Sequence, residues 1–324
     1  MKIGVVLAVL LGLAAAVYLV WFIGFGAVFS AIATAGFGGL AILCLYALCV
    51  FVVLAAAWMA LLPRGQRRVR DFYLARLVRD SIAEISPFSP VGGMVAAARM
   101  MVLKGMPVAT ASASVAADAT TEAMAQAVFL ALGLYFGLEQ FRQLPAAGPL
   151  TEAMVIVLLL AVPGIAALVF LQRRGAGFAQ KVAVRFFPSA AEDTASFGAA
   201  VNTIYDSPAR LAVSAALHLI AWIGSGIGTW IGFRLVGGHI GVLPAIALEA
   251  LLCTIRSIAV FVPAAIGVQE AGYAMLAPLF GLPAEMGLAV SLLKRAREIV
   301  IGVPALLIWQ GIEGRQAFSG APHG

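Results

Sequence analysis

Ten ionisable side chains occur in stretches of this sequence that are otherwise apolar, and their types suit them to ion pairing or to binding a polar group. Five are basic and five are acidic, so their formal charges cancel. They are Arg99, Arg256, Lys294, Arg295, Arg297, Asp118, Glu122, Glu249, Glu270 and Glu298. In a membrane, a charge without a partner is costly, so these groups must face one another or a hydrated cavity.

These charges have two interpretations at this point. In the first, they are structural ion pairs that fix the register of packed helices. In the second, some of them line a hydrated groove that receives a polar headgroup, and their concentration around two breaks in the chain favours this groove. Asp118 and Glu122 lie four residues apart on one helical face and repel each other unless a cation such as Arg99 lies between them. The zero balance is compatible with an anionic, a zwitterionic or a neutral headgroup.

The two breaks interrupt the segments 71–104 and 244–281, which are each too long for a single crossing. The first break is "SPFSPVGG" (86–93) and the second is "VPAAIGV" (262–268). The residues that break the helices are Pro87, Pro90, Gly92, Gly93, Pro263 and Gly267. Such breaks free backbone polar groups, which are tolerated at membrane depth only where protein or water covers them. We therefore expect two re-entrant helical hairpins, with a complete crossing by one of them as the alternative.

Composition supplies the setting for these charges and breaks. The chain has 324 residues, of which 63% are hydrophobic and 11% are charged, whereas soluble domains carry about 25% charged residues. Runs long enough to cross a bilayer as helices lie near 3–30, 37–62, 108–137, 150–171, 211–236 and 285–310. We expect an all-α polytopic membrane protein in which 1–320 forms a single integral membrane domain and the run 3–30 is a retained first span.

The connectors predict the orientation. Two of them, 62–80 and 172–185, are strongly basic, whereas 137–153 carries a single arginine, so the first two belong in the cytoplasm. Both termini then lie in the cytoplasm, and 172–210 is a cytoplasmic connector. The formal charge of +6 is explained by these connectors, and no nucleic-acid partner is implied.

An internal repeat relates the two hairpins at an offset of 176 residues. Repeat 1 spans about 1–137 and repeat 2 about 150–312, and each contains three spans and one hairpin. Since three crossings are an odd number, the second unit is inverted relative to the first, which is the build of many transporters. The offset pairs Asp80 with Arg256 and Asp118 with Lys294, so equivalent positions carry opposite charges.

The sequence offers little support for an enzyme. Its three cysteines and three histidines form no cluster with metal-ligand spacing, and no nucleotide-binding motif occurs, so we expect neither a metal nor a cofactor. Ser225 could act as an intramembrane nucleophile only with a base within hydrogen-bond reach, and His218 is seven residues away on the same helix. A hydrolase is therefore disfavoured.

The two break regions, "PVGGMVAAARMMVLKGMPVATASASVAADATTEA" (90–123) and "VPAAIGVQEAGYAMLAPLFGLPAEMGLAVSLLKRAREI" (262–299), resemble the signature regions of the lysylphosphatidylglycerol synthase transmembrane, or flippase-like, family. The resemblance covers about 5–310 and is greatest to the hopanoid-biosynthesis-associated branch. It reaches Pro90, Gly92, Gly93 and Arg99 in the first region and Pro263, Gly267, Glu270 and Arg295 in the second. The "PAAIG" stretch departs from relatives that have more glycines or prolines, which leaves the shape of the second hairpin open.

The resemblance implies a bacterial inner-membrane protein that moves lipids between leaflets, with membrane lipids, hopanoids among them, as its partners. The sequence ends soon after Arg315, before any soluble aminoacyl-transferase part, so aminoacylation of lipid is not expected. In this hypothesis Arg99 and Arg295 contact the headgroup or its counter-charge, while Glu270 and Glu122 balance them. The alternatives are a non-catalytic assembly factor that holds lipid-biosynthesis enzymes at the membrane, and a membrane-embedded transferase. The oligomeric state stays open.

Overall fold

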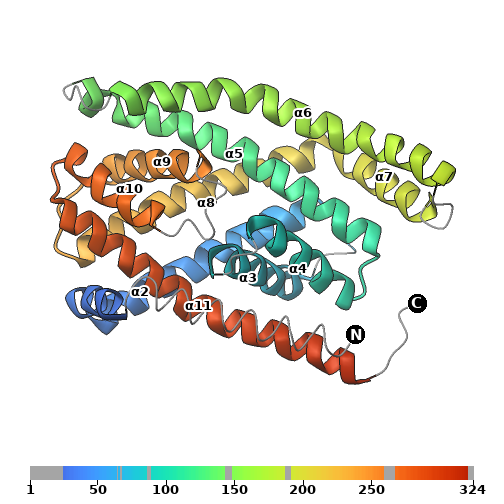
Figure 1. Ribbon diagram of the computed structural model, residues 1–324, viewed down its shortest axis with the longest axis horizontal. Coiled ribbons are helices and arrows are strands. Elements are labelled where there is room, and N and C mark those ends of the chain that lie inside the picture. Colours follow the sequence, from blue (N-terminus) through green and yellow to red (C-terminus); the bar gives the residue numbers. More distant parts are fainter. Residues whose placement is uncertain are drawn as a thin grey trace.

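The computed structural model describes residues 25–63, 65, 68–85, 89–142, 148–186, 191–258 and 267–319. These residues form helices and turns, and no strand occurs among them (Figure 1). The expectation of an all-α protein is thereby confirmed. Most of the expected first span, 3–30, lies outside the described residues.

Four helices are long and apolar enough to cross a membrane. They are α2 (Phe25–Ala60), α5 (Val108–Arg142), α6 (Gly148–Phe186) and α8 (Pro208–Leu235). They agree with four of the six apolar runs expected from the sequence. The apolar part of α2 begins at Ala33, close to a kink where Gly36 adopts a φ of 73°. The last expected run lies in α11 (Ala284–Ser319), a helix as long as α2 that carries more charges.

The first hairpin consists of α3 (Val69–Ile85) and α4 (Ser89–Leu103), which pack along each other. Its break therefore lies where the sequence expects it, with Pro90, Gly92 and Gly93 in the first turns of α4 and Pro87 outside the described residues. A Cβ atom on Gly93 would lie 2.3 Å from the backbone oxygen of Arg79. Glycine at this position lets the two arms approach closely.

The second hairpin consists of α9 (Val242–Ile258) and α10 (Val268–Leu276), followed by the short 3-10 helix η5 (Ala277–Phe280). Gly267 precedes α10 with a φ of 78°, a conformation that favours glycine. Pro263 lies outside the described residues. The connector expected at 172–210 contains the end of α6 and the helix α7 (Ala191–Tyr205), which packs against α5 and α6.

The last helix of each half also packs on the other half. Helix α5 packs on α8 and α9 of the second half, and α11 packs on α2 and α3 of the first half. In Figure 1, α5 and α6 run along one edge of the molecule and α11 along the opposite edge, with both hairpins drawn between them. Each hairpin has its own hydrophobic cluster: Trp58, Phe72 and Met100 belong to the first, and Phe233 and Leu251 to the second.

We expect Gly93→Ala to lower the free energy of unfolding by about 1 to 3 kcal/mol, because the added methyl group meets the backbone of Arg79, which has no rotamer that could move away. The measurement is the thermal unfolding midpoint in detergent. Gly311→Ala is the matched control, since an added Cβ there meets nothing within 4 Å. Equal midpoints for the two variants would contradict the close contact.

Candidate functional site

The first group of ion pairs, the α3–α5 cluster, joins two arginines to the two carboxylates that the sequence places four residues apart. Arg76 donates to Asp118 at 2.9 Å and to Glu122 at 2.6 Å. Arg79 also donates to both carboxylates, with a distance of 2.7 Å to Glu122. The Arg76 side chain is 2% exposed and that of Asp118 is fully buried. Asp80 completes the cluster by accepting from Arg76.

These contacts correct the expectation for Arg99. Arg99 lies on α4 and donates to Glu313 of α11 at 3.2 Å, so it does not separate Asp118 from Glu122. The two arginines of α3 have that role, because they are three residues apart on the face of α3 that meets α5. The Arg99–Glu313 pair is a separate contact between the two halves of the chain.

His218 belongs to the surroundings of Asp118 and does not serve Ser225. Its Nε2 lies 2.9 Å from Asp118 Oδ1, and its ring is fully buried. Ser225 donates instead to Glu249 at 2.8 Å. The serine–histidine pair that a hydrolase would need is therefore not assembled in this structure.

The second group, the α9–α11 cluster, surrounds Glu249 and Lys294. The Lys294 ammonium donates to Glu249 at 2.8 Å and to the hydroxyl of Tyr273 at 2.6 Å. Thr229 of α8 donates to Glu249 at 2.6 Å. Both charged side chains are less than a tenth exposed. Because several hydrogen bonds satisfy each of them, this pair can remain charged in an apolar environment.

The third group, the tip cluster, lies at the ends of the hairpin arms next to the breaks. Arg256, near the end of α9, donates to Glu84, near the end of α3, at 2.9 Å. Arg295 of α11 donates to Glu270 at 2.9 Å and to Glu298 at 3.0 Å. Glu270 also accepts from the backbone N–H of Gly267 at 2.8 Å, which caps α10. The Glu84–Arg256 pair thus links the two hairpins.

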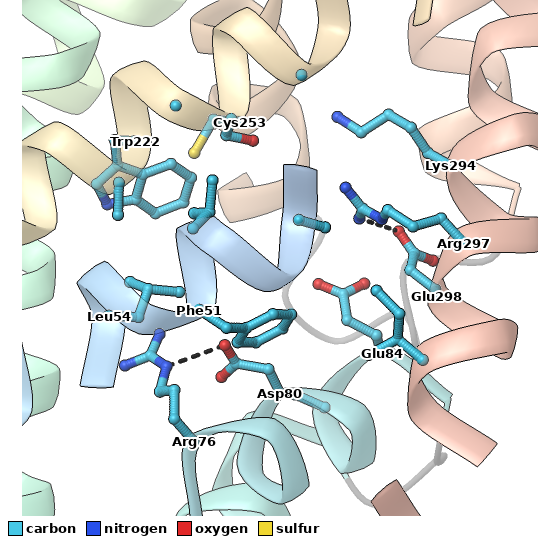
Figure 2. A pocket seen from close by; sticks show the side chains of 18 of the residues that line it. Phe51, Leu54, Arg76, Asp80, Glu84, Trp222, Cys253, Lys294, Arg297 and Glu298 are labelled. Atoms are coloured by element: carbon cyan, nitrogen blue, oxygen red, sulfur yellow. Dashed lines mark hydrogen bonds and ion pairs between the residues drawn. The ribbon is translucent and has the colours of Figure 1, made fainter. Parts of the chain in front are cut away.

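A cavity of about 470 Å³ lies between these three clusters, and α2, α3, α5, α8, α9 and α11 all contribute to its wall. Five basic and five acidic side chains line it, so its formal charge is zero. They are Arg76, Arg79, Arg256, Lys294, Arg297, Asp80, Glu84, Glu122, Glu249 and Glu298. Figure 2 shows side chains of α3, α9 and α11 converging on this space, together with the apolar side chains of Phe51, Leu54 and Trp222.

The cavity contains some of the site residues expected from the sequence and leaves others outside its wall. The expected charges that line it are Glu122, Glu249, Arg256, Lys294, Arg297 and Glu298. Asp118, Glu270 and Arg295 do not line it, but each is bonded to residues of the three clusters. Arg99 lies apart from it, with Glu313.

Four charged residues of the wall were missed by the site prediction: Arg76, Arg79, Asp80 and Glu84. The stretch 62–80 was interpreted as a basic cytoplasmic connector, whereas the structure buries Arg76 and Arg79 inside the protein. Only part of that basic charge therefore bears on orientation. The sequence could have indicated them, because residues spaced three or four positions apart lie on one face of a helix, as Arg76 does with Arg79 and Asp80.

We expect Glu249→Gln to lower the free energy of unfolding by about 3 to 5 kcal/mol, because it leaves Lys294 charged and buried without its counter-charge. The double variant Glu249→Gln/Lys294→Met should recover much of this loss, since neither charge then remains. The measurement is thermal unfolding in detergent.

The control for this test is Asp206→Asn, which removes one partner of an exposed pair with Arg173. Its effect should stay within about 0.5 kcal/mol, because water solvates both groups. A double variant as unstable as Glu249→Gln alone would show that the charge imbalance is not the cause.

Comparison with known proteins gives one match. The profile of the family described as the lysylphosphatidylglycerol synthase TM region matches residues 5–305, which is most of the chain and includes all three clusters. Among curated proteins and among solved structures, no significant match was found. The chain therefore belongs to the lysylphosphatidylglycerol synthase TM region family, which links this multi-pass membrane protein to lipid metabolism or transport.

Proposed function

We propose that this protein is a lipid translocase that moves a lipid between the leaflets of the inner membrane, with a hopanoid and a phospholipid as the two candidate cargoes. The cavity carries this proposal. It is large enough for a polar headgroup, it lies between the two halves of the chain, and it is lined by five acidic and five basic side chains. Family membership supports the same assignment.

The charge balance of the cavity suits the passage of a headgroup. Most of its charged groups are already paired with each other, so the wall presents dipoles and hydrogen-bonding groups without a net field. Such a wall replaces part of the hydration of a headgroup and does not trap it as a lone charge would. The apolar side chains of Phe51, Leu54 and Trp222 provide surface for the lipid tails.

The proposal includes the inverted repeat with two re-entrant hairpins. Three observations support it. The contacts of α5 with α8 and α9 have counterparts in the contacts of α11 with α2 and α3. In both halves an ion pair joins the first hairpin arm to the last helix, with cations on α3 in one half and the anion on α9 in the other. Asp118 and Lys294, the equivalents at the offset of 176, take part in these two pairs.

Transport would proceed by rocking of one half against the other. The α3–α5 and α9–α11 clusters hold each hairpin to the last helix of its own half, and these two helices also pack on the other half, so the rocking would have to slide α5 along α8 and α9 and α11 along α2 and α3. The Glu84–Arg256 pair joins the two hairpins, and its side chains are 30% and 32% exposed. Because this pair is more exposed than the Glu249–Lys294 pair, it is the contact between the hairpins that we expect to open and close.

We further propose that both termini lie in the cytoplasm and that the protein acts without a cofactor and without enzymatic chemistry. The basic residues Arg68 and Arg70, which are exposed next to the first hairpin, support a cytoplasmic position for that end of the chain.

A second candidate function is a non-catalytic assembly factor that holds lipid-biosynthesis enzymes. The burial of Glu249 and Lys294 favours it for the α9–α11 cluster, since a mutually satisfied pair of this kind stabilises a fold without contacting a substrate. The partly exposed groups of the cavity wall favour the translocase.

The test is transbilayer movement of headgroup-labelled phospholipids and hopanoids in proteoliposomes, comparing the wild type with Glu84→Gln. We expect protein-dependent movement that falls about tenfold in the variant, because Arg256 then carries an uncompensated charge in the pathway, and about 1.4 kcal/mol on the barrier has this effect. The unfolding midpoint should stay close to that of the wild type, since both partners are partly exposed.

Asp206→Asn is the matched control, because it neutralises a carboxylate outside the cavity and should leave the rate unchanged. Equal rates for Glu84→Gln and the wild type would remove the cavity from the pathway. Movement no faster than in protein-free vesicles for any lipid would contradict the translocase and favour the assembly factor.

A further inference from the structure

One cation of the cavity wall stands out by its weak pairing. Within the described residues, the Arg297 guanidinium contacts the carboxylate of its neighbour Glu298 at 3.4 Å, and its side chain is 23% exposed. Arg76, Arg256 and Lys294 each make shorter contacts, of 2.9 Å or less, to carboxylates. Arg297 therefore keeps donors available for an anionic group that enters the cavity.

An apolar groove of about 260 Å³ lies beside this cavity, between α2, α3 and α11. Its wall includes Leu48 of α2, Leu77 and Val78 of α3, and Ile301 and Ile308 of α11. Ile301 also lines the charged cavity, so the two spaces adjoin at this side chain.

Helix α11 connects Arg297 to the groove along one face. Arg297, Ile301, Ala305 and Ile308 follow one another at spacings of four, four and three residues, which places them on one stripe of the helix. The stripe is about 16 Å long at the helical rise of about 1.5 Å per residue.

We propose that this stripe is a binding site for a phosphodiester lipid, with the phosphate oxygens on Arg297 and one hydrocarbon chain in the groove between α2, α3 and α11. The proposal rests on the proposed function, because it takes the charged cavity as the headgroup site, and it favours a phospholipid over a hopanoid without phosphate. The adjacency of cavity and groove at Ile301 selects the occupant: an inorganic anion would leave the groove empty, and an apolar molecule would leave Arg297 without an anion.

Binding of two lipids to the purified full-length protein tests this site. Phosphatidylmethanol has a phosphodiester as its whole headgroup, and diacylglycerol with the same chains lacks the phosphate. Dissociation constants are measured for both by native mass spectrometry. We expect Arg297→Gln to weaken phosphatidylmethanol binding about tenfold and to leave diacylglycerol binding unchanged, because only the first lipid has a charge-assisted contact to lose.

The groove is tested with a matched pair of variants on α11. Ile308 lines the groove and Leu307 does not, and the two side chains are 48% and 53% exposed, so neither substitution disturbs the core. Ile308→Trp should fill the groove and weaken both lipids about fivefold, whereas Leu307→Trp should weaken neither. Arg234→Gln, which removes an exposed cation outside the cavity, is the control for charge.

The site is overturned if wild-type protein binds phosphatidylmethanol no better than diacylglycerol, if Arg297→Gln affects both lipids equally, or if the two tryptophan variants behave alike. These outcomes are independent of transport. Binding that follows the expected pattern, with no transbilayer movement in proteoliposomes, would contradict the proposed function and leave the lipid site in place.

Discussion

The structure depends on one constraint, namely that a charged side chain in an apolar environment needs a charged partner and further hydrogen bonds. Asp118 and Glu122 illustrate it, because two carboxylates on one helical face are stable only with Arg76 and Arg79 between them. This requirement fixes where α3 lies on α5. In the second half, Lys294 and Glu249 fix α9 on α11 in the same manner. The ion pairs thus join the first arm of each hairpin to the last helix of its half, and the hydrophobic clusters pack the hairpins against the other helices.

The same constraint explains why the cavity has a neutral but strongly polar wall. Each cation that fixes a hairpin brings an anion with it, so cations and anions accumulate in equal numbers where the hairpins meet. Packing alone would produce an apolar interface at this place. The polar wall is thus a consequence of how the hairpins are held. Close backbone contacts add to this packing, because Gly93 and Gly287 have no side chain and lie against the backbones of Arg79 and Tyr273.

Much of this arrangement could be predicted from the sequence, and the part that could not has a physical reason. The apolar runs predicted α2, α5, α6 and α8, because a crossing helix needs a long run of apolar residues. The breaks at 86–93 and 262–268 predicted where the hairpin arms end. Helix α3 was missed as a source of site residues, since its mixed composition resembles a basic connector. The pairing of Arg99 was also missed, because Glu313 lies 214 residues further along the chain and only the fold brings it within reach.

In the proposed translocase, the strength of pairing distinguishes the charges that hold the fold from those that could meet a lipid. Glu249 and Lys294 are buried and bonded to several partners, so they have no capacity left for a ligand. Glu84 and Arg256 are partly exposed and joined across the two hairpins, so their contact can change during a conformational cycle. Within the part of the chain that the structure describes, Arg297 contacts one carboxylate, at 3.4 Å, and lines the cavity, which is why the proposed phosphate site is placed on it. The sequence shows which residues are charged, but it does not show how strongly each is paired. The structure adds this information, and weakly paired charges are the better candidates for contact with a ligand.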